Sequence, residues 1–275
     1  SGAPAQRLSV ELAMMFAGLD LGRPLIMGIV NVTPDSFSDG GEAFDAADAI
    51  ERGLALIADG ADIIDVGGES TRHGAEPVAP KTEAARVLPV ITALAKAGAV
   101  VSIDSRHASV MGEAVQAGAA IINDVSALSF DANALRVAAD TGASVILMHM
   151  KGTPQTMAGM AEYDDVVAEV CSYLRMRIDV CIAAGIERTR ICIDPGFGFA
   201  KRMKHNYELL DRLPEIAAIG PTVCAGLSRK FGKTENPKER LDISIDLARR
   251  AVSGGARIIR VHDVAATVAG LAEAP

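Results

Sequence analysis

The chain has 275 residues, of which 49% are hydrophobic, 23% are charged and 4% are aromatic. Lys and Arg number 27 against 35 Asp and Glu, and this net charge of −8 argues against a nucleic-acid-binding protein. The composition excludes a disordered chain, and no run of about 18 apolar residues is present that would predict a transmembrane helix or other membrane partner.

Short apolar runs alternate along the chain with longer helical segments. The expected strands are residues 25–30, 63–66, 100–103, 120–122, 145–148, 191–193, 222–225 and 258–261. The expected helices are residues 46–58, 81–96, 108–117, 132–140, 163–184, 206–213, 244–253 and 264–272, and several are followed by a glycine that can end a helix. The alternation predicts an α/β protein with parallel strands joined by crossovers.

Eight such units in a chain of this length fit a closed (β/α)8 TIM barrel. A doubly wound open sheet is the alternative. No linker or low-complexity segment divides the chain, so we expect a single domain over residues 1–275. Residues 1–24 are expected to form an N-terminal extension that caps the bottom of the barrel.

The cysteines predict a reducing environment. Cys171, Cys181, Cys192 and Cys224 contain no C-x-x-C pair, and their spacing fits neither a zinc site nor a small disulfide scaffold. We expect buried, reduced thiols. The first residues lack the basic region, apolar stretch and cleavage site of a secretory signal, so the expected location is the cytoplasm.

Nearly every expected strand ends in a polar or charged residue. These residues are Asn31, Asp65, Asp104, Asn123, Asp124, His149, Asp194, Ser228, Arg229, Lys230, Arg260 and His262. In a barrel of this type the working residues lie where strands run out into loops. Polar groups beside buried strands need a partner or a ligand, so the pattern predicts a functional site at this end.

One part of this set favours an anion. Its members at the strand ends are Lys230, Arg260 and His262, and Thr71 and Arg72 join them from the loop after residues 63–66. Arginine offers a planar fork to phosphate oxygens, and strand alternation would place Arg260 and His262 on one face. Asn31 can add a neutral oxygen ligand to a Mg²⁺ ion that bridges a diphosphate.

The other part favours a flat, nitrogen-containing ring. Asp104, Asn123 and Asp194 would form a buried hydrogen-bonding pocket. A carboxylate accepts two parallel hydrogen bonds and matches the edge of a 2-amino-4-oxo pyrimidine, while asparagine offers a donor and an acceptor. Together the two sets predict a heterocycle that carries a diphosphate.

Some of these polar residues have a structural interpretation instead. We expect Asp65 to hold the loop that follows its strand, and His107 and His149 to be packing or hydrogen-bonding residues. Asp124 either takes part in the site or pairs with a neighbouring cation.

Two long motifs make the pattern specific. They are M-G-I-V-N-V-T-P-D-S-F-S-D-G-G at 27–41 and I-I-D-V-G-G-E-S-T-R at 63–72. Shorter ones are S-I-D-S at 102–105, I-I-N-D-V at 121–125, L-M-H-M at 147–150, D-P-G-F-G-F at 194–199, S-R-K at 228–230 and R-V-H-D-V at 260–264. In this order they resemble the signatures of the dihydropteroate synthase family over nearly the whole barrel.

The resemblance implies a cytoplasmic, homodimeric (β/α)8 transferase of folate biosynthesis, and a target of sulfonamides. It implies that 4-aminobenzoate is joined to (7,8-dihydropterin-6-yl)methyl diphosphate with Mg²⁺-assisted loss of diphosphate. The neutral aniline nitrogen would attack the pterin methylene carbon, with no enzyme nucleophile.

The resemblance also implies residue roles. The pterin would be held by Asp104, Asn123, Met148, Asp194, Gly226 and Lys230. The diphosphate would be held by Asn31, Thr71, Arg72, Arg260 and His262, with Asn31 as the metal ligand. The 4-aminobenzoate site would contain Phe37, Arg72, Ser228 and Lys230. The catalytic group would comprise Asp35, Arg72, Lys230, Arg260 and His262.

Three departures from the family pattern cluster near the expected 4-aminobenzoate side. His73 stands where proline is expected, the residues after S-R-K read F-G-K-T at 231–234, and 242–246 replace a Gly- and Ser-rich segment. A diverged pterin-binding protein with another acceptor or no catalysis is therefore one alternative. A methyltransferase that acts on a reduced folate is the other.

Overall fold

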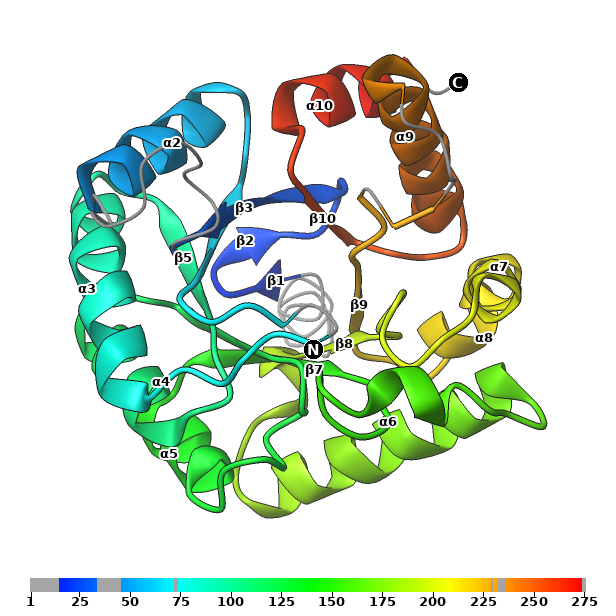
Figure 1. Ribbon diagram of the computed structural model, residues 1–275, viewed down its shortest axis with the longest axis horizontal. Coiled ribbons are helices and arrows are strands. Elements are labelled where there is room, and N and C mark those ends of the chain that lie inside the picture. Colours follow the sequence, from blue (N-terminus) through cyan, green and yellow to red (C-terminus); the bar gives the residue numbers. More distant parts are fainter. Residues whose placement is uncertain (1–14, 34–45, 72–73, 229, 232–235, 274–275) are drawn as a thin grey trace, which may run out of the picture.

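The computed structural model describes residues 15–33, 46–71, 74–228, 230–231 and 236–273. Eight parallel strands form a closed barrel in the order β10-β3-β4-β5-β6-β7-β8-β9, and helices surround it (Figure 1). The strands are β3 Leu25–Asn31, β4 Ile63–Gly67, β5 Val100–Asp104, β6 Ile121–Asp124, β7 Ser144–Met148, β8 Ile191–Asp194, β9 Thr222–Ala225 and β10 Ile258–Val261. The predicted (β/α)8 barrel is confirmed, and the open sheet is excluded.

The outer ring consists of helices that follow the strands. They are α2 Ala46–Ala58, α3 Pro80–Lys96, α4 Ala108–Gln116, α5 Ala134–Thr141, α6 Val166–Ala183, α7 Met203–Asp211, α8 Leu213–Ala217, α9 Pro237–Ser253 and α10 Val264–Ala272, with 3-10 turns η2 Met157–Met160 and η3 Arg188–Arg190. Within the described part of the chain, no helix is both long and apolar enough to cross a membrane.

Three helices differ from the sequence-based expectation, each for a local reason. The helix expected at 206–213 is present as α7, which begins and ends earlier than expected. A separate helix, α8, follows it with Pro214 in its first turn, where the missing N–H of proline is tolerated. Helix α6 begins after Asp165, whose side chain accepts hydrogen bonds from two backbone N–H groups. Helix α9 begins at Pro237, after the capping Asn236, rather than at residue 244.

The floor of the barrel interior is apolar. We call the following buried residues the floor cluster: Phe16, Leu21, Leu25, Met27, Ile63, Ile121, Ile146, Cys192, Cys224 and Ile258. Phe16 and Leu21 belong to a segment that contains an antiparallel hairpin of β1 Met15–Phe16 and β2 Leu19–Asp20, which the sequence analysis did not anticipate. This segment packs where the barrel strands begin. All four cysteines are buried free thiols, as predicted.

The strands extend further than expected at the opposite end. Parallel pairing continues through Asn31, Gly67, Asp104 and Asn123, which lie at one level in register. On the other side of the barrel Met148 pairs with Asp194. The predicted site residues therefore belong largely to the strand ends, whose positions are fixed by backbone hydrogen bonds.

Candidate active site

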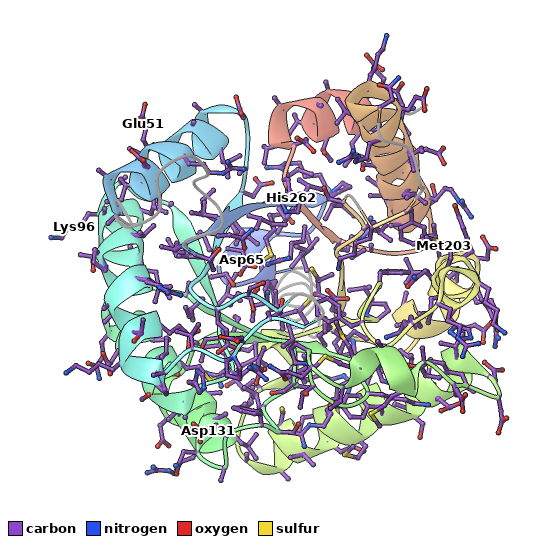
Figure 2. All side chains as sticks on the ribbon, viewed as in Figure 1. Glu51, Asp65, Lys96, Asp131, Met203 and His262 are labelled. Carbon is purple, nitrogen blue, oxygen red and sulfur yellow. The ribbon has the colours of Figure 1, made fainter. Side chains whose placement is uncertain are left out.

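A polar layer lies directly above the floor cluster. Side chains on one face of a strand recur every second residue, so Asp65, Asn123, Asp194 and Arg260 face inward, two positions after Ile63, Ile121, Cys192 and Ile258. Asp104 joins these residues, because its carboxylate accepts a hydrogen bond from Arg260. We call these five residues the polar layer. Figure 2 shows Asp65 and His262 inside the ring, whereas Glu51 and Lys96 lie outside it.

Arg260 is held between two carboxylates. Its Nε donates to Asp65 Oδ2 at 2.6 Å, and its Nη2 donates to Asp104 Oδ2 at 2.9 Å. Asn123 Nδ2 donates to the same Asp65 oxygen at 3.1 Å. The expectation that Asp65 holds the loop after its strand is wrong, because its inward direction leads its carboxylate to residues of β6 and β10.

This arrangement shifts the pKa values of Asp104 and Arg260. Burial, reinforced by the negative charge of Asp65, raises the pKa of Asp104 to about 7, although Arg260 opposes the shift. Burial lowers the pKa of Arg260, but Asp65 and Asp104 outweigh it, so the net shift is upward. The guanidinium therefore stays charged, and Asp104 titrates near neutrality.

A second acid–base pair lies across the barrel. Burial raises the pKa of Asp194, and the nearby Lys230 ammonium opposes this. Burial lowers the pKa of Lys230 to about 8, against the attraction of Asp194. A Cβ atom at Gly226 would lie 3.5 Å from Lys230 Nζ and 3.9 Å from Asp194 Oδ2, so glycine leaves space beside both groups.

Backbone constraints fix the position of Asp194. Its Oδ1 accepts a hydrogen bond from Gly196 N at 2.7 Å. Gly196 has a φ of +70°, and a Cβ there would come within 2.0 Å of the His149 carbonyl oxygen. Only glycine fits this turn, which explains the glycine of the D-P-G motif.

The remaining predicted residues either contact one another, lie at strand ends and in loops, or fall outside the described residues. Ser228 Oγ lies 3.2 Å from His262 Nδ1, so a residue predicted to bind 4-aminobenzoate is next to one predicted to bind diphosphate. Asn31 ends β3, Met148 ends β7 and is buried, and Thr71 lies in the loop after β4. Asp35, Phe37, Arg72, His73 and Arg229 lie outside the described residues.

Lys201 was missed by the sequence analysis. Its buried ammonium lies 3.0 Å from His149 Nδ1 and donates to the carbonyl oxygens of His149 and Phe199. Burial lowers the pKa of Lys201 to about 7 and that of His149 to about 2. His149 is thus a hydrogen-bonding residue, as expected. No local pattern distinguishes Lys201 from a surface lysine.

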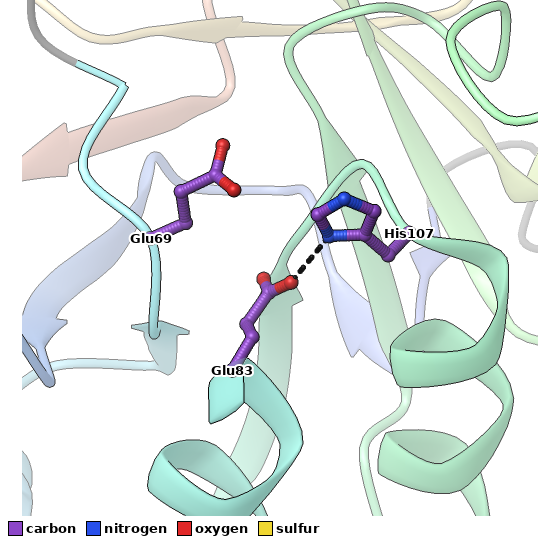
Figure 3. Close-up of side chains that lie close together, drawn as sticks. All are labelled: Glu69, Glu83 and His107. Carbon is purple, nitrogen blue, oxygen red and sulfur yellow. Dashed lines mark hydrogen bonds and ion pairs between the residues drawn. The ribbon is translucent and has the colours of Figure 1, made fainter. Parts of the chain in front are cut away.

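An ionic cluster supports the loop that follows β4. One ligand atom from each of Glu69, Glu83 and His107 lies within 4.8 Å of the others (Figure 3). Each carboxylate already has a side-chain partner, because Glu69 pairs with Arg106 and Glu83 lies 2.7 Å from His107 Nδ1. The cluster is therefore explained as an ion-pair network rather than as a donor set for a metal.

Asp124 has a structural environment. Its side chain is fully buried and accepts hydrogen bonds from the backbone N–H groups of Ser126 and Leu128 and from the Ser126 hydroxyl. No ion pair of Asp124 is found in the described part of the chain. It therefore stabilises the turn after β6.

The chain is similar to known proteins over nearly its whole length. The profile of the pterin binding enzyme family matches residues 27–262. The dihydropteroate synthase of Escherichia coli K12 is 48% identical over 264 residues, covering 94% of this chain and 93% of that protein.

Two solved structures of Xanthomonas albilineans dihydropteroate synthase are similar throughout. The structure with 4-aminobenzoic acid has a TM-score of 0.87 and 46% identity, covering 93% of this chain and 94% of that one. The structure with 7,8-dihydropteroate has a TM-score of 0.83 and 44% identity, covering 92% and 93%. The chain therefore belongs to the pterin-binding enzymes and, within them, to the dihydropteroate synthase family of transferases.

Proposed function

We propose that this barrel joins 4-aminobenzoate to (7,8-dihydropterin-6-yl)methyl diphosphate and releases diphosphate. The observation that carries the proposal is the direct contact, at 2.9 Å, between a carboxylate suited to the ring and a guanidinium suited to its tail, Asp104 and Arg260. The ligands named for the two Xanthomonas structures, 4-aminobenzoic acid and 7,8-dihydropteroate, support the acceptor and the product.

The pterin would lie against the polar layer. Asp104, Asn123 and Asp194 supply acceptors and a donor for the ring nitrogens and the 2-amino and 4-oxo groups. Lys230 would add a donor beside Asp194. Met148 offers an apolar wall, and Gly226 leaves room for a flat ring next to Lys230.

The reaction is a substitution at the pterin methylene carbon. The bond from this carbon to the diphosphate oxygen breaks, and its electron pair leaves with diphosphate. The lone pair of the aniline nitrogen forms the new C–N bond, after which that nitrogen loses a proton. Arg260 and His262, with Thr71 and Arg72, would bind the diphosphate and stabilise its developing charge.

The chemistry of Asn31 suits a metal ligand. Mg²⁺ prefers oxygen donors and is commonly bound through one or two protein groups plus substrate phosphates. Among the described residues, none hydrogen-bonds to the Asn31 side chain at the end of β3. Asn31 would therefore hold a Mg²⁺ ion that, when bound, neutralises charge on the diphosphate.

The acceptor would bind on the Ser228 side of the barrel. Ser228 lies 3.2 Å from His262, so 4-aminobenzoate there would approach the diphosphate end of the pterin. Phe37, Arg72 and Lys230 would complete this subsite, and Asp35 would help to order it.

The direct test is release of diphosphate from the pterin substrate. We expect release that requires both Mg²⁺ and 4-aminobenzoate, competition between 4-aminobenzoate and a sulfonamide, and loss of turnover in Lys230→Ala. Pterin binding without release would support a diverged binding protein instead. Methyl transfer from a reduced folate would support the methyltransferase alternative.

We further propose that the whole chain, 1–275, is one pterin-binding domain that works as a cytoplasmic homodimer. The four buried free thiols are compatible with a reducing compartment. Light scattering after size exclusion would measure the mass, and a monomer at assay concentrations would contradict the dimer.

A further inference from the structure

Asp65 touches residues assigned to both halves of the proposed substrate. Its side chain is 0% exposed, and one oxygen, Oδ2, receives both Arg260 Nε and Asn123 Nδ2. The other oxygen has no hydrogen-bond partner in the described part of the chain. We propose that Asp65 is a positioning residue that fixes the Arg260 guanidinium for diphosphate and the Asn123 amide for the ring, an inference that rests on the proposed function.

Asp65 becomes more important once the pterin is bound. In the ligand-free site, Arg260 is held at Nε by Asp65 and at Nη2 by Asp104. The ring takes Asp104, which frees one edge of the guanidinium. The Nε contact with Asp65 then keeps the guanidinium plane fixed while its Nη atoms meet the diphosphate.

Asp65 also decides which end of the Asn123 amide faces the ring. A carboxylate oxygen accepts hydrogen bonds, so only the Nδ2 side of the amide can face it. The Asn123 oxygen is thereby directed away from Asp65 and is available as an acceptor. Since Asp65 is fully enclosed by the strands, it acts through these two neighbours rather than by touching the substrate.

Asp65→Asn distinguishes positioning from simple charge. Removing a negative charge near an anion site would, by electrostatics alone, tighten diphosphate binding. Loss of the anchor predicts the opposite: calorimetry should show a Kd for inorganic diphosphate about tenfold higher, and kcat should fall about 100-fold, as for a lost electrostatic donor. The Kd of 6-hydroxymethyl-7,8-dihydropterin, which lacks the tail, should rise less than that of diphosphate.

Asp124→Asn is the matched control. Asp124 is equally buried, but it holds a backbone turn. We expect a lower Tm with an unchanged Kd for diphosphate and an unchanged kcat. A general effect of disturbing any buried aspartate would instead move both variants alike and would contradict the proposal.

Arg260→Lys provides a second test if Asp65→Asn does not fold. Lysine keeps the positive charge but lacks the Nε that donates to Asp65 Oδ2, so diphosphate affinity and kcat should again fall. Unchanged or tighter diphosphate binding in either folded variant would overturn the positioning role. Failure of the proposed function is distinguishable, because the unmodified protein would then release no diphosphate.

Discussion

The two levels of the barrel interior differ sharply although the same strands build them. Four strands each supply an apolar residue to the floor cluster and a polar residue two positions later, in the pairs Ile63 and Asp65, Ile121 and Asn123, Cys192 and Asp194, and Ile258 and Arg260. Two residues advance a strand by only about 7 Å. Burial of apolar surface therefore stabilises one level, and ligand-binding chemistry occupies the next.

The two levels obtain their stability differently. The floor cluster needs no partner outside itself, because its side chains are removed from water by packing. The polar layer is stable only while its charges compensate one another, since an unpaired buried charge is costly. Substitutions in the two levels should therefore separate loss of folding from loss of activity.

Arg260→Ala should have the largest effect on activity, because it removes the cation from two carboxylates. We expect kcat/KM to fall by about 10²–10³, and urea unfolding to show a loss of about 3 kcal/mol. Arg257→Ala is the control, because Arg257 is exposed just before the start of the same strand. Equal losses of kcat/KM in both variants would contradict the conclusion that the site lies at the end of β10 and not at its start.

Phe16→Ala should lower stability and leave substrate binding unchanged. Truncation of this side chain, which is 1% exposed, leaves a cavity in the floor cluster. The expected loss in the free energy of unfolding is about 3–5 kcal/mol. The KM values of folded protein should be unchanged, and Met15→Ala, at an exposed neighbour, should change neither quantity. A raised KM for the pterin would show that the floor also shapes the site.

The pH dependence should report Asp104 of the polar layer together with the neighbouring Lys230. Activity requires Asp104 ionised and Lys230 protonated, so kcat/KM for the pterin diphosphate should rise through pH about 7 and fall above about 8. Lys230→Arg should remove the descending limb in whatever activity remains, whereas Phe16→Ala should keep both limbs. A flat profile from pH 6 to 9 would contradict the assignment.

The same groups predict how stability changes with pH. The pKa of Asp104 is raised in the folded state, so its contribution is fully present below its ordinary value of 3.8 and is lost as pH rises through about 7. The pKa of Lys230 is lowered from 10.5 to about 8, so its contribution increases between these values. Urea unfolding at several pH values should show the free energy of unfolding fall between pH 3.8 and about 7 and rise between about 8 and 10.5. A change of the reverse sign in either range would contradict the assignment.

Asp165→Ala should have the smallest effect, because it touches only the outer ring. Asp165 accepts hydrogen bonds from Val167 N and Ala168 N at the start of α6. Loss of this cap should cost about 1 kcal/mol with no change in kcat. Asp164→Ala, at an adjacent exposed residue, is the control; a change in kcat for either would link the outer ring to the site.

Local sequence patterns were sufficient for the architecture. Each of the eight apolar runs could be recognised within its own few residues, and each became a barrel strand. The polar residues that follow Ile121, Cys192 and Ile258 could also be assigned to the site, because strand alternation is a property of neighbouring residues.

Contacts between distant strands could not be obtained in this way. Asp65 is 195 positions from Arg260 in the sequence, and nothing near either residue names the other as a partner. The hairpin before Leu25 and the separate helix α8 were likewise missed, since packing and a single proline decide them.

Residue order along the chain was therefore enough to establish the repeated strand–helix units and the kinds of chemical group at the strand ends. Only the closed barrel decided that Asp65, rather than a loop residue, anchors Arg260 and Asn123. The physical reason is that β3 and β10 become neighbours only when the sheet closes, and the register at that closure determines which inward side chains meet.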